Sequence, residues 1–400
     1  MPGATSPDDA TRGHPRAGDR PGVPDDATRG HPRAGDRPGE PDDATCDDPY
    51  TGDRACAPDD ATCSDPRTGE RPGVPDDAPH NSRAGDPPRE PDDAPHNSRR
   101  ATGCPVQIAA LDRAALAEVT GVLAAACRFD RAAEVADEKV FGDGPAGPPQ
   151  PLGAWDGDAL VGVAAIAGDR VRVLAVTPAA RRRGVGSALL SACIEAARAA
   201  GASTLRTLDQ PGNYLAPGID ERNAEAIGWL ERRGFRRLPE PRVDVLIDVR
   251  GNPRVSAERA GELAAAAAER GYEVRRARPG EPALLDAVAA EFGGAWPFEL
   301  ARALDFDPPA VHVALRDGAY AAFAAHDGNN RGLGWFGPTG TWPAHRGNGL
   351  GEALLVACLV DVAARHPQCE VAWIGPRAFY DKVAGIAGER RFHVLVRDLG

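Results

Sequence analysis

Hydrophobic patterns typical of packed secondary structure begin at Val106 and continue to the end of the 400-residue chain. A strand is predicted at 106–111, and apolar residues three or four apart over 112–127 predict a helix. Residues 151–176 predict three antiparallel strands, because Asp-Gly and Gly-Asp pairs interrupt the apolar runs as turn signals. The elements predicted next are a helix at 181–201, a strand at 203–208, a helix at 221–234 and a buried strand at 243–249.

The same order of elements then recurs, after a predicted connecting helix at 256–271. The predicted elements are a strand at 273–278, helices at 282–292 and 296–305, a hairpin over 311–327, a strand at 332–342, a helix at 345–366, a strand at 371–375, a helix at 378–385 and a last strand at 392–399. The second copy is therefore expected to end with one strand fewer than the first. The expected organisation is a domain at 104–250, a linker helix at 251–271 and a domain at 272–400.

Residues 1–103 lack this patterning. The first hundred residues contain no Leu, Ile, Phe or Trp, but 19 Asp, 3 Glu and 13 Arg, and the string PDDA recurs in them six times at a spacing of 17 or 16. Such a segment cannot bury enough apolar surface to offset the entropy of ordering. We expect a disordered extension, with a multivalent docking tail as the alternative.

Charge and cysteine spacing exclude several classes of function. The chain carries 47 Lys+Arg against 59 Asp+Glu. This acidic balance argues against nucleic-acid binding, which requires an excess of basic residues on the binding surface. An apolar run of roughly 18 residues, the length of a membrane helix, is not found. The eight cysteines include no C-x-x-C pair and no zinc spacing with histidine. We expect a cytoplasmic, metal-free protein without a membrane or nucleic-acid partner.

Two glycine-rich helix entries carry the chemical signal. They read VTPAARRRGVGSALL (176–190) and TWPAHRGNGLGEALL (341–355), with their arginines 165 residues apart. R-x-x-G-x-G alone is weak in a chain this rich in Arg and Gly, but strand, proline, arginine, glycines and helix recur together. Glycines allow close approach of a ligand, and the first N–H groups of a helix lack partners, so each turn is suited to an anion such as a diphosphate.

Strand–P-x-x-R-x-x-G-x-G–helix in this order of elements resembles the Gcn5-related N-acetyltransferase (GNAT) superfamily, in two copies covering about 106–399. The resemblance implies an open, mixed α/β, mostly antiparallel fold in each copy, with acetyl-CoA as co-substrate. The implied coenzyme-binding residues are Leu174, Val176, Arg181, Gly184, Val185, Gly186 and Ser187 in the first copy, and Arg346, Gly349, Leu350, Gly351 and Glu352 in the second. WFGPTGTWPAHRGNGLG and VAWIGPRAFYDK are also similar to bacterial tandem acetyltransferases of the glucosaminide N-acetyltransferase type.

Acetyl transfer to an amine needs an acid for the leaving thiolate, and a tyrosine, with an ordinary pKa near 10, is suitable. The resemblance implies Tyr380 in that role, although a core aromatic is the alternative. The first copy has Leu230 at the matching position, and Tyr214 would substitute only if its loop folds over the site. We therefore expect the second copy to be the catalytic one.

No residue stands out as the base. The first copy has no histidine, whereas the second has His312, His326 and His345. Three tryptophans of the second copy could wall an acceptor pocket or pack in the core: Trp296, Trp335 and Trp373. The expected activity is acetyl transfer to a primary amine of a small molecule, with an amino sugar among the candidates. A non-catalytic coenzyme-A-binding or sensing module and a protein or peptide N-acetyltransferase are the alternatives, and the oligomeric state is left open.

Overall fold

The computed structural model describes residues 106–400, so the predictions for the N-terminal extension lie outside the described residues. The helices and strands of the first half (residues 106–250) are β1 (Gln107–Ala110), α1 (Leu116–Ala126), α2 (Ala136–Val140), β2 (Gln150–Asp156), β3 (Ala159–Ala167), β4 (Arg170–Val176), α3 (Val185–Ala199), β5 (Thr204–Thr207), β6 (Ile219–Asp220), α4 (Ala224–Glu231), β7 (Arg236–Arg237) and β8 (Arg242–Asp248). Those of the second half (residues 251–400) are α5 (Ala257–Glu269), β9 (Glu273–Arg276), α6 (Pro282–Glu291), α7 (Trp296–Leu304), β10 (Val311–Arg316), β11 (Ala319–His326), β12 (Trp335–Thr341), α8 (Leu350–Ala363), β13 (Gln368–Val371), α9 (Arg377–Val383), β14 (Gly388–His393) and β15 (Leu395–Asp398).

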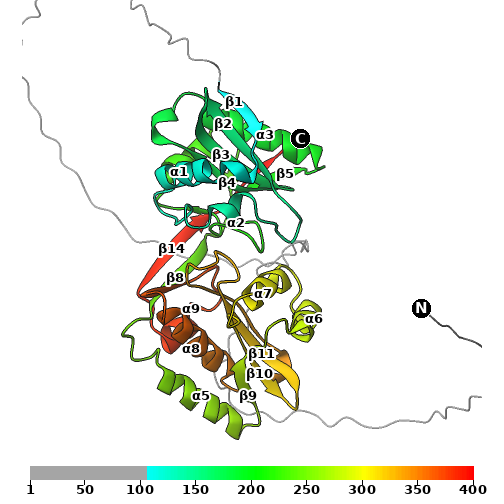
Figure 1. Cartoon of the computed structure of the whole chain (residues 1–400), viewed down its shortest axis with the longest axis vertical. Helices are drawn as coiled ribbons and strands as arrows, with labels where there is room; N and C mark the ends of the chain where they lie inside the picture. Colours follow the sequence, from blue (N-terminus) through cyan, green and yellow to red (C-terminus); the bar gives the residue numbers. More distant parts are fainter. Residues whose placement is uncertain (1–105) are drawn as a thin grey trace, which may run out of the picture. The chain divides into compact units, whose positions relative to one another are not determined.

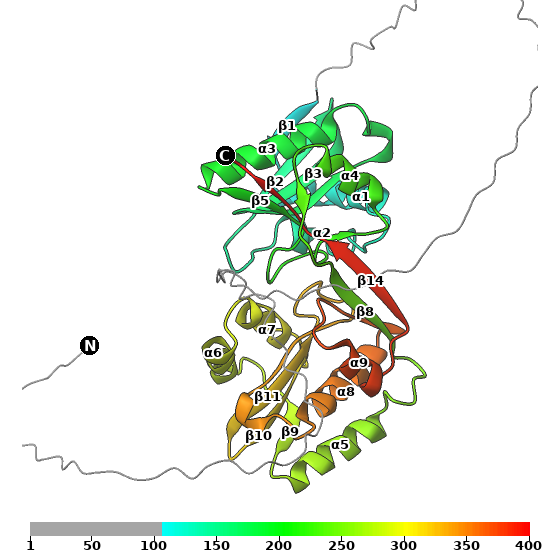
Figure 2. The same ribbon diagram turned by 180° about the vertical axis from the view of Figure 1, so that it is seen from behind.

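The strands form two sheets, each covered by helices on both faces (Figure 1). In the first sheet, Ala164 and Ile166 of β3 pack with α3, whereas Val163 and Ala165 pack with α1 and α2. This alternation explains why β3 is a continuous apolar run, since both of its faces are buried. In the second sheet, α5, α8 and α9 cover one face and α6 and α7 the other (Figure 2). The predicted mixed α/β, mostly antiparallel fold is confirmed.

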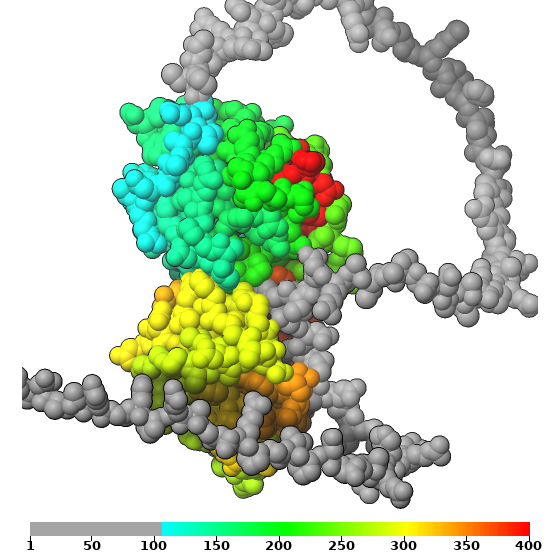
Figure 3. All heavy atoms as spheres, turned by 90° about the vertical axis from the view of Figure 1, so that its right-hand side faces the viewer, coloured from blue at the N-terminus to red at the C-terminus, as the bar shows by residue number. Residues whose placement is uncertain are grey.

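Each half gives its last predicted strand to the sheet of the other half. The first sheet has the order β1-β2-β3-β4-β5-β15-β7, and the second has the order β6-β14-β8-β13-β12-β11-β10-β9. β8 thus lies between β13 and β14, and β15 lies between β5 and β7. Figure 1 shows β8 beside β14. Figure 3 shows the red C-terminal residues among the green ones of the first half. The domain boundaries remain a prediction, but the sheets do not follow the division at residue 250.

The predicted strands near the C-terminus need correction. The single strand expected at 392–399 is two strands, β14 and β15, which belong to different sheets. The sequence of β14 shows no alternation of apolar residues, because it is rich in charged residues. One of these, Arg390, makes ion pairs with Asp130 (2.6 Å), Asp220 (3.0 Å) and Glu370 (2.8 Å). By count, residues 106–250 contain eight strands and residues 251–400 contain seven, so the expected difference of one strand is present.

The strand predicted at 371–375 also differs, since β13 ends at Val371. Trp373 has a left-handed φ of 49°, and its N–H donates to Asp244 Oδ1 (2.7 Å) instead of to a neighbouring strand. The backbone therefore departs from the sheet at Trp373, and the N–H of Ile374 returns to bond the carbonyl of Val243 in β8 (3.0 Å). In residues 106–400 no helix combines the length and the apolar character that crossing a bilayer requires.

Candidate active site

The two glycine-rich turns have closely similar backbone geometry. The first glycine turn (residues 181–186) leads into α3 and the second (residues 346–351) into α8, each through a left-handed glycine at the N-cap: Gly184 with φ 90° and Gly349 with φ 71°. A side chain at either position would be strained, because L-residues rarely adopt such φ values. The first backbone N–H groups of both helices lack intrahelical partners and can receive an anion.

The arginine of each turn braces the strand that precedes it. Arg181 Nε donates to the carbonyl of Val176 (3.2 Å), and Arg346 Nε donates to the carbonyl of Thr341 (3.4 Å). Both guanidinium groups thus fix the path from strand to turn. The structure therefore gives them a bracing contact, and the anion-binding capacity of the turns comes from backbone N–H groups.

The third residue of each of the helices α3 and α8 is bonded to an arginine from another element. Arg233 Nη2 donates to Ser187 Oγ (2.9 Å), and Arg259 Nη2 forms an ion pair with Glu352 Oε1 (2.6 Å). The glutamate, which alone would disfavour an anion, is therefore neutralised by the linker helix α5.

Two aromatic residues establish how the halves correspond beyond the turns. A Cβ built on Gly186 would lie 3.4 Å from Trp229, and one on Gly351 would lie 3.6 Å from Phe379. Trp229 and Phe379 thus occupy equivalent places, so the next residues, Leu230 and Tyr380, correspond. This agrees with the alignment of the two copies predicted from the sequence.

In both sheets the strand before the turn separates from its parallel neighbour. β4 pairs with β5 only at Arg170 and Val171, and β12 pairs with β13 only at Trp335 and Phe336. A bulge follows, because the register of β4 against β3 and of β12 against β11 shifts there. Leu174 and Val176 lie beyond this split in β4 and pack, half-buried, against the core that contains α3.

A cavity of about 410 Å³ opens at the split between β12 and β13; we call it the tryptophan cavity. Trp296, Trp335 and Trp373 all line it, and so does Tyr380. The sequence left open whether the tryptophans line a pocket or pack in a core; Trp296 and Trp335 do both, being 7% exposed. The structure thus brings the predicted tyrosine and the three tryptophans to one site.

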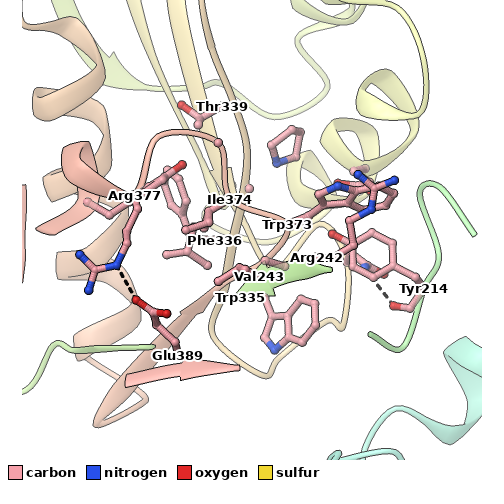
Figure 4. Close-up of a pocket in the computed structure, with 18 of the residues that line it drawn as sticks. Tyr214, Arg242, Val243, Trp335, Phe336, Thr339, Trp373, Ile374, Arg377 and Glu389 are labelled. Carbon is pink, nitrogen blue, oxygen red and sulfur yellow. Dashed lines mark hydrogen bonds and ion pairs between the residues drawn. The ribbon is translucent and has the colours of Figure 1, made fainter. Parts of the chain in front are cut away.

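A residue of the first half completes the tryptophan cavity. Tyr214 contacts Trp373 edge to face, with ring centroids 5.8 Å apart, and lies 6.1 Å from Trp335. Figure 4 shows it on the side of the cavity opposite Arg377 and Glu389. Tyr214 therefore does not line the β4–β5 split of the first half, where the sequence analysis considered it as a substitute for the acid.

Charged groups of both signs line the tryptophan cavity. Glu299 of α7 is buried, Arg242 stacks over the Trp373 ring at 4.3 Å, and Arg377 is ion-paired with Glu389. Beneath Trp373, burial and then the nearby charge of Glu370 raise the pKa of Asp244 well above its ordinary value.

The corresponding place in the first half is filled by an arginine. The bulge residue of β12 is Gly337, where an added Cβ would meet nothing within 4 Å. Its counterpart in β4 is Arg172, which is fully buried and donates to Gln210 and to the carbonyl of Gly142 (2.5 Å). Burial lowers the pKa of Arg172 to about 10. The first split is therefore occupied at the point where the second is open.

The histidines considered as bases lie apart from the tryptophan cavity. His312 Nε2 bonds Asp361 Oδ2 (2.7 Å), and His326 contacts the same carboxylate (3.4 Å). Burial alone would raise the pKa of Asp361, but bonds from both histidines and from Arg276 hold it below its ordinary value. His345 bonds Tyr272 Oη (3.2 Å) beside the second glycine turn.

Sequence reasoning missed Arg242, Glu240 and Glu299 of the cavity lining. The sequence analysis placed Arg242 and Glu240 in the first half, because nothing in the local sequence indicates that β8 joins the second sheet. Glu299 could have been found, since it lies one helical turn after Trp296 on the same face of α7.

Comparison with known proteins agrees with this geometry. Residues 150–237 match the family model described as Acetyltransferase (GNAT) domain, while no curated protein matches the chain. A solved structure of a GCN5-related glucosamine N-acetyltransferase region in a fungal multi-domain GH3 β-N-acetylglucosaminidase is 17% identical, with a TM-score of 0.59. That match covers 73% of this chain but only 38% of the fungal protein.

Two matches extend over nearly the whole of the other protein. A tandem GNAT protein from the clavulanic acid biosynthesis pathway is 20% identical with a TM-score of 0.54, and the match covers 74% of this chain and 99% of that one. A GCN5-related N-acetyltransferase from Sphaerobacter thermophilus is 17% identical with a TM-score of 0.50, at 74% and 96% coverage. Residues 150–237 thus match a GNAT acetyltransferase domain, and the chain shares the fold of the tandem GNAT structure over most of the residues that the structure describes.

Proposed function

We propose that the chain transfers an acetyl group from acetyl-CoA to a primary amine of a small molecule, and that the second half is the catalytic one. The observation that carries this proposal is the tryptophan cavity, which combines an open split, Tyr380 and a glycine turn in the second half. In the first half the equivalent split is filled by Arg172. The first half then acts by contributing Tyr214 and by binding coenzyme structurally.

The residues of the second half fit the coenzyme. The left-handed Gly349 and the small Gly351 leave the first N–H groups of α8 accessible to a diphosphate, together with Leu350 and the neutralised Glu352. β12 beyond Phe336 has no partner from β13, so its edge is open to a pantetheine chain. Acetyl-CoA supplies the activated acyl group when bound. In the first half, Gly184, Val185, Gly186 and Ser187 form the corresponding turn, and Leu174 and Val176 of β4 precede it.

Tyr380 and Glu299 divide the proton transfers. The Tyr380 hydroxyl, buried in the cavity wall, donates its proton to the departing sulfur. Only a free amine attacks a thioester, so the acceptor must lose a proton after it binds. The buried carboxylate of Glu299 holds the ammonium group and receives that proton, directly or through water. The tryptophan rings present apolar faces on which a ring such as that of an amino sugar stacks.

Thiol release from acetyl-CoA with a panel of amino sugars, aminoglycosides, polyamines and peptides tests this proposal. Tyr380→Phe should lower kcat about a hundredfold with little change in KM, the usual size of an acid–base effect. Gly349→Glu should abolish turnover, whereas the matched Gly184→Glu should retain it.

Two results would contradict parts of the proposal. Full activity in Tyr380→Phe together with loss in Gly184→Glu would assign catalysis to the first half. Saturable acetyl-CoA binding without thiol release for any amine would indicate a non-catalytic binding module, and activity on peptides alone would indicate a protein N-acetyltransferase.

A further inference from the structure

Arg270, at the end of the linker helix α5, lies beside the second glycine turn. A Cβ built on Gly349 would be 3.4 Å from Arg270 Nη2. Arg270 is exposed, and within residues 106–400 its guanidinium makes no hydrogen bond or ion pair. A side chain with five N–H donors therefore stands next to the turn with its bonding capacity unused.

α5 is fixed against the second glycine turn near both of its ends. Arg259, in the first turn of α5, forms the ion pair with Glu352 and donates to the carbonyl of Val383 (2.8 Å). Just after α5, Tyr272 bonds His345 with an Oη–Nδ1 distance of 3.2 Å, and the two rings meet edge to face. Arg270 is thus carried by a segment whose position relative to the turn is set by several contacts.

The first half obtains its arginine at this place from a different segment. Arg233 follows α4, stacks over Trp229 at 4.1 Å and bonds Ser187. By the correspondence of Trp229 with Phe379, the equivalent position in the second half is Val383, which is buried. The second half therefore has no arginine at that position, and the basic residues beside its turn come from α5 or its end.

We propose that Arg270 binds a phosphate group of coenzyme A in the second half, so that the linker helix is part of the coenzyme site. The planar guanidinium can form two parallel N–H···O bonds with a phosphate. Because Arg259 neutralises Glu352, no carboxylate of the turn competes for Arg270. This proposal rests on the proposed function, since it requires coenzyme A at the second glycine turn.

Calorimetric binding of coenzyme A to the full chain tests the role of Arg270. The variants are Arg270→Ala, Arg270→Lys and, as a control, Arg250→Ala, which removes an exposed arginine at the opposite end of α8 near Pro367. They are measured in a Gly184→Glu background, so that binding reports the second turn. If that background does not fold, the series is run in the otherwise wild-type chain, where one of the two sites should weaken.

Arg270→Ala should raise the Kd for coenzyme A about tenfold, Arg270→Lys should raise it less, and Arg250→Ala should leave it unchanged. The slope of log Kd against log salt should also fall in Arg270→Ala, because one charge contact with phosphate is lost. With 3′-dephospho-coenzyme A, a persisting difference between Arg270→Ala and its parent assigns the contact to the diphosphate. A vanishing difference assigns it to the 3′-phosphate.

Unchanged affinity and salt dependence in Arg270→Ala would overturn the inference and leave Arg270 only a favourable charge at the C-terminus of α5. That result is distinguishable from failure of the proposed function, in which the parent chain itself would bind no coenzyme A. Absence of binding by the parent would overturn both.

Discussion

β8 and β15 each pair within the sheet of the other half. A substitution in either strand should therefore destabilise the half to which the strand is paired, and not the half in which its residues are numbered. Leu395 of β15 is fully buried in the core between the first sheet and α3. Replacing such a leucine by alanine costs about 3 kcal/mol through lost burial and the cavity left behind. This corresponds to a roughly hundredfold rise in the population of the opened state. The opening should occur in the first sheet, although Leu395 lies at the far end of the chain.

Hydrogen exchange followed by mass spectrometry of peptides measures where protection is lost. Leu395→Ala should accelerate exchange in α3 and β5 while sparing α8. The matched control is Ile247→Ala in β8, which is also fully buried but belongs to the core containing α8. Ile247→Ala should accelerate exchange in α8 while sparing α3. If each variant instead loosens the half in which its residue is numbered, the strand exchange in solution is refuted.

Two further outcomes follow from residues of the first half that contact the second half. In steady-state kinetics, Tyr214→Ala should raise the KM for the amine about tenfold while leaving the KM for acetyl-CoA within twofold, and Tyr214→Phe should behave as wild type. An equal rise in both KM values would contradict the placement of Tyr214 at the amine site. Burial alone would raise the pKa of Glu138, but the charges of Lys139 and Arg302 lower it from 4.5 to about 2. The ionised Glu138 side chain therefore contributes fully to stability above pH 4.5, and this contribution is lost as the pH falls toward 2. In urea unfolding, the free-energy advantage of wild type over Glu138→Gln should therefore shrink by up to about 3 kcal/mol between pH 6 and pH 2, and a constant difference would contradict this reading.

Local patterns in the sequence were enough for most elements and for the two turns. β3, α3 and α8 have periodic apolar residues, and the glycines at 184 and 349 adopt the left-handed conformation that suits a turn of this kind. The same spacing also placed Tyr380 opposite Leu230, which the contacts of Trp229 and Phe379 support.

The exchange of strands and the completed cavity could not be read from the sequence. A strand pattern specifies which face is buried, but not which of two similar sheets supplies the partner. Arg242 and Tyr214 reach the tryptophan cavity from residues numbered in the first half, so no spacing links them to Tyr380. Trp373 was placed in a strand because its left-handed φ depends on the buried carboxyl of Asp244, a contact 129 residues distant.

The position of β15 has a consequence for synthesis on the ribosome. Val396 pairs with Arg206, so the gap between β5 and β7 stays open until about 190 further residues have been translated. A growing chain would expose the unpaired edge of β5 during that interval, and such edges promote association between nascent chains. Completion of the N-terminal sheet is therefore among the last events in the maturation of this protein.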